Sequence, residues 1–184
     1  MKDKSGNIKL KLIRRNIVSL FYYSVISIAV LMVFSCKIYR FSDASVDPNL
    51  KTFTINPTNN IATFQNASAA SAFTEKLKEK FIRETRMVLT RQDGDIEYSC
   101  TITEYNIEPI ALTNTQTLAQ NRLNINVRVE CINHQDEKKS YNQNFRDGEN
   151  FSAQVAFNSV EADLQNTIFD RITQQIFNKS FSNW

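Results

Sequence analysis

The chain has 184 residues, of which 22 are Lys or Arg and 19 are Asp or Glu, so its formal net charge is +3. Residues 1–35 contain six of the basic residues and one of the acidic residues, which leaves 16 basic and 18 acidic groups in the remainder. A weakly acidic remainder lacks the main electrostatic requirement for binding nucleic acid. It also has only Gly94 and Gly148, too few glycines for a phosphate-binding loop of the dinucleotide or P-loop type.

The first 35 residues have the pattern of a secretory signal. Four basic residues precede the nearly uncharged stretch 17–34, and Ser35 and Cys36 follow it. A cysteine at this place resembles the lipobox of bacterial lipoproteins, in which the thiol carries a diacylglycerol and the signal is removed. The alternative is an uncleaved membrane anchor, since a span needs roughly 18–20 apolar residues. We expect a signal peptide at 1–35 and a tether at 36–50, and in either case the rest of the chain lies outside the cytoplasm.

A strand and a helix are predicted first in the remainder. Residues 51–55 alternate in strand fashion and stop before Pro57. Over 69–85 the apolar residues recur every four positions among charged ones, which predicts an amphipathic helix. The apolar residues of that helix are Phe73, Leu77 and Phe81. A short apolar run at 87–89 follows, and Asp93-Gly94-Asp95 then predicts a turn.

The next two segments, 96–103 and 122–131, alternate strictly between apolar and polar residues and predict strands with one buried and one wet face. In an antiparallel pair, Cys100 would stand opposite Cys131, and Ile102 opposite Val129. The two thiols could then form a disulfide in an oxidising compartment. The alternative is two buried free thiols, which the strict geometry of disulfides favours.

A further strand at 140–146 and a second helix complete the predicted elements. Asn158 is expected to cap the helix, with Glu161 as its reciprocal partner. The apolar stripe of this helix comprises Val160, Leu164, Ile168, Ile172 and Ile176. The order of elements predicts an α+β two-layer sandwich for 51–184, with two helices on one face of a mixed or antiparallel sheet of about four strands.

The polar residues favour binding over catalysis. His134 is the only histidine and lies in a charged turn, so neither a general base nor an imidazole-based zinc site is expected. Asp93 and Asp95 flank a glycine as in calcium loops, but a turn needs the same residues and the other ligand positions are absent. We therefore expect no enzyme activity and no metal site.

The expected wet face of the sheet is rich in hydroxyl, amide and guanidinium groups. Its members are Glu97, Ser99, Thr101, Thr103, Arg122, Asn124, Asn126 and Arg128. Arginine is suited to bidentate capture of phosphate, so Arg122 and Arg128 are candidate phosphate-binding residues. The alternative is an ordinary solvated sheet face.

Several segments resemble the lipopolysaccharide-assembly lipoprotein family LptE, in the form found in Bacteroidetes. The matching segments are Cys36-Lys37-Ile38-Tyr39-Arg40-Phe41-Ser42-Asp43-Ala44-Ser45, Lys51-Thr52, Phe73-Thr74-Glu75-Lys76-Leu77-Lys78-Glu79-Lys80-Phe81, Asp93-Gly94-Asp95-Ile96, Asn121-Arg122-Leu123, Ile176-Phe177-Asn178-Lys179-Ser180 and Asn183-Trp184. Lys37 and Asp43 stand where the family usually has glycine. The resemblance covers essentially all of the chain after the signal.

The resemblance implies a non-enzymatic partner of LptD, the outer-membrane β-barrel that inserts lipopolysaccharide into the outer leaflet. A family member plugs that barrel, assists its assembly and can bind lipopolysaccharide, for which Arg122 and Arg128 are the expected phosphate contacts. The implied location is the outer membrane, facing the periplasm, with the lipid on Cys36 as anchor and no other cofactor. The alternative is a scaffold lipoprotein of another envelope assembly machine.

Overall fold

The computed structural model describes residues 46–64, 66, 68–110 and 119–181, so the predicted signal peptide and Cys36 lie outside the described residues. In chain order the described elements are β1 (Thr52–Ile55), β2 (Asn59–Asn60), α2 (Ala69–Glu84), β3 (Val88–Thr90), β4 (Ile96–Ile110), β5 (Gln120–Asn133), the short 3-10 helix η2 (Glu137–Lys139), β6 (Tyr141–Ser152) and α3 (Phe157–Phe181). Within these residues, no helix is both long and apolar enough to cross a membrane.

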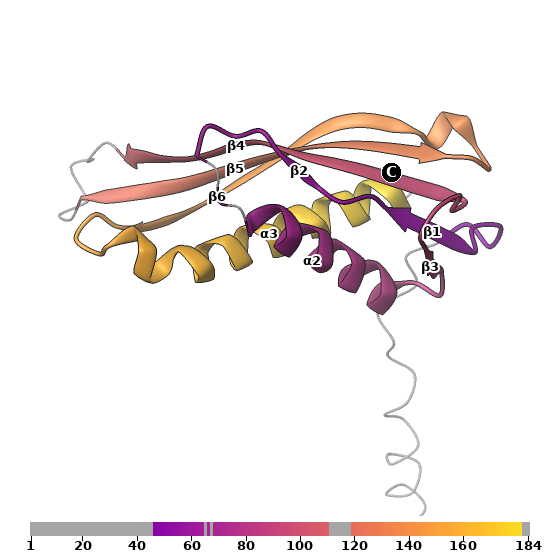
Figure 1. Cartoon of the computed structure of the whole chain (residues 1–184), viewed down its shortest axis with the longest axis horizontal. Coiled ribbons are helices and arrows are strands. Elements are labelled where there is room, and N and C mark those ends of the chain that lie inside the picture. Colours follow the sequence, from indigo (N-terminus) through magenta and orange to yellow (C-terminus); the bar gives the residue numbers. More distant parts are fainter. Residues whose placement is uncertain (1–45, 65, 67, 111–118, 182–184) are drawn as a thin grey trace, which may run out of the picture. The chain divides into compact units, whose positions relative to one another are not determined.

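The strands form one mixed sheet in the order β3-β1-β4-β5-β6, with β2 paired to β4 beyond the end of β1. β1 is parallel to both of its neighbours, whereas β4, β5 and β6 form an antiparallel meander. Figure 1 shows α2 and α3 together on one side of the long ribbon of β4, β5 and β6. The predicted α+β sandwich is confirmed. The sheet has six strands and not about four, because β2 and β3 are too short to show a periodicity.

Helix α2 joins both layers through its apolar stripe, as the four-residue spacing predicts. Phe73, Leu77 and Phe81 are fully buried. The ring of Phe81 lies 5.6 Å from that of Phe53 in β1 and 4.9 Å from that of Tyr98 in β4. It also contacts two rings of α3, so this single side chain of α2 contacts three other elements.

Helix α3 confirms the predicted stripe but not the predicted cap. Four of the five stripe residues are buried, and Val160 packs partly buried against the core. The helix begins at Phe157, so Asn158 lies inside its first turn and is not the cap. The ring of Phe157 packs 5.7 Å from that of Phe151 in β6. Glu161 instead accepts hydrogen bonds from Tyr105 Oη at 2.9 Å and Asn66 Nδ2 at 2.7 Å.

The predicted cysteine register is wrong by two residues. Cys100 stands opposite Val129, and Cys131 stands opposite Tyr98. A shift of two keeps every side chain on its own face, so a period-two pattern cannot distinguish the two registers. Both thiols are free and buried, and burial raises the pKa of each to about 12, which keeps them protonated.

A β-bulge interrupts the alternation that the sequence predicts for β4. Ile102 pairs with Val127 and Glu104 with Asn126, so Thr103 is the extra residue. After the bulge the odd-numbered residues face the helices, and Tyr105 is buried beside them. The side chain of Glu104 consequently lies on the face of the sheet away from the helices.

Strand β6 is a twelve-residue edge whose inward side carries charges. Asp147 and Glu149 face the helix layer and bind Arg171 of α3, with N–O distances of 3.0 and 2.6 Å. The guanidinium also donates to the carbonyl of Gly148 at 3.1 Å. Helix α3 is therefore joined to this edge by an ion-pair cluster in addition to its apolar contacts with the sheet.

Candidate binding face

The side of the sheet away from the helices is a polar surface built by β4, β5 and β6, which we call the outer face. Strand alternation places its members opposite the buried rows of the same strands. Its main polar members are Glu97, Ser99, Thr101, Glu104, Asn106, Glu108, Arg122, Asn124, Asn126, Arg128, Asn142, Asn144, Arg146 and Asn150. Amides and both signs of charge alternate over it, which favours a polar partner over an apolar one.

The side chain of Arg122 is hydrogen-bonded to two asparagines of the outer face. Its Nη1 donates to Asn150 Oδ1 at 2.8 Å, and its Nε donates to Asn124 Oδ1 at 3.2 Å. Gly148, opposite Asn124, leaves the room for this arrangement, since a Cβ there would lie 2.7 Å from Arg122 Nε. Two of the guanidinium nitrogens are thus committed to this local network.

A carboxylate stands in the same network. Glu108 is opposite Arg122 in the ladder and accepts hydrogen bonds from Asn124 Nδ2 at 3.0 Å and Asn106 Nδ2 at 3.3 Å. An anion that approached Arg122 would therefore meet Glu108 as well. The field around Arg122 is mixed, and its geometry suits amide or sugar hydroxyl partners as much as phosphate.

Arg128 has a different environment. It is exposed, faces Thr101 and Asn144 across its two ladders, and forms no hydrogen bond or ion pair with any described residue. It lies six residues from Arg122 on β5, about 20 Å along the strand. The Arg146–Glu104 ion pair, at 2.8 Å, lies between them. The structure therefore does not bring the two predicted phosphate ligands together, and each would need its own contact.

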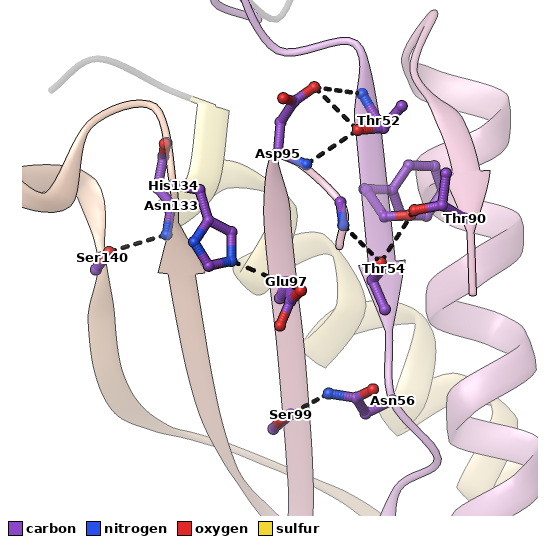
Figure 2. Close-up of polar contacts among 12 residues, drawn as sticks. Thr52, Thr54, Asn56, Thr90, Asp95, Glu97, Ser99, Asn133, His134 and Ser140 are labelled. Carbon is purple, nitrogen blue, oxygen red and sulfur yellow. Dashed lines mark hydrogen bonds and ion pairs between the residues drawn. The ribbon is translucent and has the colours of Figure 1, made fainter. Parts of the chain in front are cut away.

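Asp95 has a structural role at the start of β1. Its Oδ2 accepts from the backbone nitrogens of Lys51 and Thr52 at 2.8 and 2.9 Å and from Thr52 Oγ1 at 3.0 Å. These bonds, led by that from Lys51, lower the pKa of Asp95 to about 2. Figure 2 shows Asp95 turned toward Thr52 at the start of β1. Over the described part of the chain, no group of acidic, histidine and cysteine side chains could hold a metal ion.

The predicted turn at Asp93-Gly94-Asp95 is a loop that connects β3 to β4 and does not close a hairpin. β1 lies between β3 and β4, so this loop crosses β1. Gly94 packs against that strand and donates its N–H to Thr54 Oγ1 at 3.1 Å, and a Cβ would lie 2.7 Å from Thr54 N. His134 is exposed nearby, with Nε2 3.6 Å from Glu97 Oε1 (Figure 2).

One pocket was not expected from the sequence. A cavity of about 340 Å³ lies beside Tyr105 and Phe64, whose rings stack 5.8 Å apart. Its other lining residues are Thr63, Asn106 and Ile107. It exists because the bulge at Thr103 reverses which residues of β4 point inward, and no sequence pattern marked that bulge.

These features define a class of protein: a small α+β domain with two helices over one sheet face and a polar surface on the other. The chain matches the model of a family described as LptE, lipopolysaccharide-assembly, over residues 50–180. The chain belongs to this family, and the resemblance seen in the sequence is confirmed.

The chain is also similar to several solved structures at low sequence identity. Protein CT253 from Chlamydia trachomatis superposes with a TM-score of 0.50 at 10% identity, covering 73% of this chain and 99% of that one. A minor lipoprotein from Acinetobacter baumannii has a TM-score of 0.47 at 16% identity, covering 71% and 91%. The rare lipoprotein B from Shewanella oneidensis has a TM-score of 0.39 at 9% identity, covering 68% and 89%. No curated protein matches the chain.

Proposed function

We propose that this protein is the lipoprotein partner of an LptD-type outer-membrane β-barrel, which it helps to assemble and occupies as a plug during insertion of lipopolysaccharide. The observation that carries the proposal is the family match over residues 50–180, in a family described by lipopolysaccharide assembly. This family assignment also supports a non-enzymatic role.

The outer face supports the role of a plug. The lumen of an outer-membrane barrel is polar, so a domain that fills it needs a polar, mixed-charge surface. β5 and β6 present asparagines and arginines in alternation with the buried rows, and the Arg146–Glu104 ion pair adds both signs of charge. A surface of this kind can hydrogen-bond to a polar barrel wall.

The proposed address rests on the N-terminal sequence. The basic region, the apolar stretch 17–34 and Cys36 follow the order of a lipoprotein signal. Several acyl chains at Cys36 would hold the domain at the outer membrane more firmly than one. The residues after Cys36 contain no run of acids, so we propose that the domain faces the periplasm.

Isolation of the tagged protein from outer membranes tests the proposed partner. A very large β-barrel should co-purify at native expression levels, and depletion of the protein should leave that barrel unfolded. Isolation of a different envelope machine would select the scaffold alternative. Isolation of the protein with no barrel, from cells that contain a folded LptD-type barrel, would overturn the proposal.

Lipopolysaccharide binding is tested by separate variants of the two arginines. Because Arg128 has no described partner and Arg122 has two, Arg128→Ala should weaken binding and leave the thermal midpoint within a few degrees. Arg122→Ala should weaken binding and also lower stability by about 1 kcal/mol, through the lost hydrogen bonds. Binding to immobilised lipopolysaccharide and thermal melts measure both effects.

Lys138→Ala is the matched control, because Lys138 is an exposed cation in η2, away from the outer face. It should leave lipopolysaccharide binding unchanged. Equal binding by wild type and both arginine variants would remove the outer face as the lipopolysaccharide contact, while leaving the barrel partnership untouched.

A further inference from the structure

The edge of the sheet opposite β6 exposes apolar side chains. β3 is the terminal strand and pairs only with β1 among the described strands. Val88 is 63% exposed and Leu89 37% exposed, while Ile82 in the last turns of α2 is 54% exposed. Leu89 stands opposite the inward Phe53, so it faces the helix layer, and Val88 stands opposite Thr52 and faces the other side. We call these three residues the β3 patch.

Three exposed cations lie near the β3 patch in the described part of the chain. Arg86 and Arg91 flank β3 on either side, both are exposed, and neither forms a hydrogen bond or ion pair with a described residue. Lys51 adjoins them, because its carbonyl accepts from Val88 N at 2.8 Å, and its own side chain is exposed. An apolar centre with a basic rim is the surface that binds a membrane interface containing anionic lipid.

One acidic side chain near this edge is ion-paired within the fold, because Glu84 lies 3.5 Å from Lys80 and 3.4 Å from Arg83. Asp95 keeps its charge while its carboxylate is hydrogen-bonded to the start of β1, and Asp93 is an exposed carboxylate beside it. The three cations at Lys51, Arg86 and Arg91 therefore outnumber these two carboxylates, in a chain whose residues after 35 are weakly acidic as a whole.

β3 lies at the end of the sheet that is nearest to the start of the described chain. The described chain begins at Val46 and enters the sheet at β1, the direct neighbour of β3. Residues 36–45 can extend at most about 35 Å. β4 alone extends about 50 Å from this end of the sheet, so a short tether brings one end of the domain to the bilayer and not the other.

We propose that the β3 patch and its rim of Lys51, Arg86 and Arg91 form a membrane-contacting edge that lies on anionic phospholipid headgroups. Val88, Leu89 and Ile82 enter the interfacial region, and the cations bind phosphate oxygens of the lipid. This inference rests on the proposed anchoring of the chain at Cys36, and it sets the orientation of the domain beside its anchor.

Depth-dependent quenching in vesicles tests the proposal with the full chain. The variant Val88→Cys carries an environment-sensitive fluorophore, and the chain is reconstituted into phosphatidylethanolamine vesicles with or without phosphatidylglycerol. Cys36 is blocked by its proposed lipid, Cys100 and Cys131 are buried, and the parent chain gives the baseline for labelling at these three cysteines. The matched control is Val155→Cys, which is 41% exposed and follows β6 at the far end of the sheet.

The expected result is strong quenching by a headgroup-proximal spin-labelled lipid at position 88, and little at position 155. The additional change Arg86→Gln with Arg91→Gln should lower the membrane-bound fraction of the edge by on the order of tenfold, because each cation near an anionic surface contributes several-fold. Removal of phosphatidylglycerol from the vesicles should also lower the membrane-bound fraction of the edge.

Equal quenching at 88 and 155 in a chain that floats with the vesicles would overturn the membrane edge and leave the proposed anchor and function standing. A spectral shift at position 88 without quenching by lipid would also overturn it, because the edge would then lie against protein. A parent chain that fails to float would overturn the anchor, and with it both the proposed address and this inference.

Discussion

Phe81→Ala should lower the free energy of unfolding by about 3–5 kcal/mol, the range for loss of a fully buried Phe. Phe81 has no exposed surface and its ring meets rings of β1, β4 and α3. The change leaves a cavity between the helix layer and the sheet. The neighbouring side chains belong to β1, β4 and α3, so they cannot all move inward to fill it. Denaturant unfolding or the thermal midpoint, measured in one mild detergent for all variants, gives the difference.

Two variants control this measurement. Phe81→Leu keeps most of the apolar volume and should lose less than half as much stability. Ile82→Ala changes the next residue of α2, which is 54% exposed, and should stay within about 0.5 kcal/mol of wild type away from membranes. A loss below about 1 kcal/mol for Phe81→Ala would contradict the central place of this ring.

Asp95→Ala should lower stability by about 2–3 kcal/mol at neutral pH, the cost of leaving donors at the start of β1 without their charged acceptor. The carboxylate binds the backbone of Lys51 and Thr52 and also Gln135 Nε2, at 2.8 Å. Asp95→Asn keeps one acceptor oxygen and should fall between wild type and Asp95→Ala. Equilibrium unfolding at pH 7 measures the series.

The pH dependence of stability is a second, independent test of the role of the Asp95 carboxylate. The pKa of Asp95 is about 2 in the fold, below the ordinary value of 3.8 for an aspartic acid side chain. A carboxyl whose pKa is depressed by folding contributes stability above its unfolded pKa and loses that contribution as the pH falls toward the folded one. The stability difference between wild type and Asp95→Asn should therefore shrink between about pH 4 and pH 2.

Asp93→Asn is the matched control in the same turn. Asp93 is exposed and has a φ of 56°, which asparagine also tolerates. Its stability should stay within about 0.5 kcal/mol of wild type at pH 7. Equal losses for Asp93→Asn and Asp95→Asn would show that the turn as a whole, and not the carboxylate of Asp95, holds β1.

The parts of the fold that sequence reasoning predicted are those with long local periodicities. The four-residue spacing of Phe73, Leu77 and Phe81 and the alternation in β4 and β5 each repeat often enough to identify an element and its buried face. The order β3-β1-β4 could not be predicted in the same way, because it depends on contacts between segments about 40 residues apart.

The register and the site were harder to predict for specific physical reasons. An alternating strand looks the same after a shift of two, so nothing local separated Cys131 opposite Tyr98 from Cys131 opposite Cys100. The bulge at Thr103 has no residue type that marks it. The separation of Arg122 from Arg128, by contrast, follows from their spacing along one strand once both are placed on β5.

The charged cluster at β6 affects whether another strand can pair with this edge of the sheet. A twelve-residue edge strand offers unsatisfied backbone groups to any extended peptide, including the same strand of another copy. Asp147 and Glu149, held inward by Arg171, place carboxylates at the rim where an added strand would have to pack its own side chains. We therefore expect these charges to disfavour the addition of a strand from another copy of the chain at this edge.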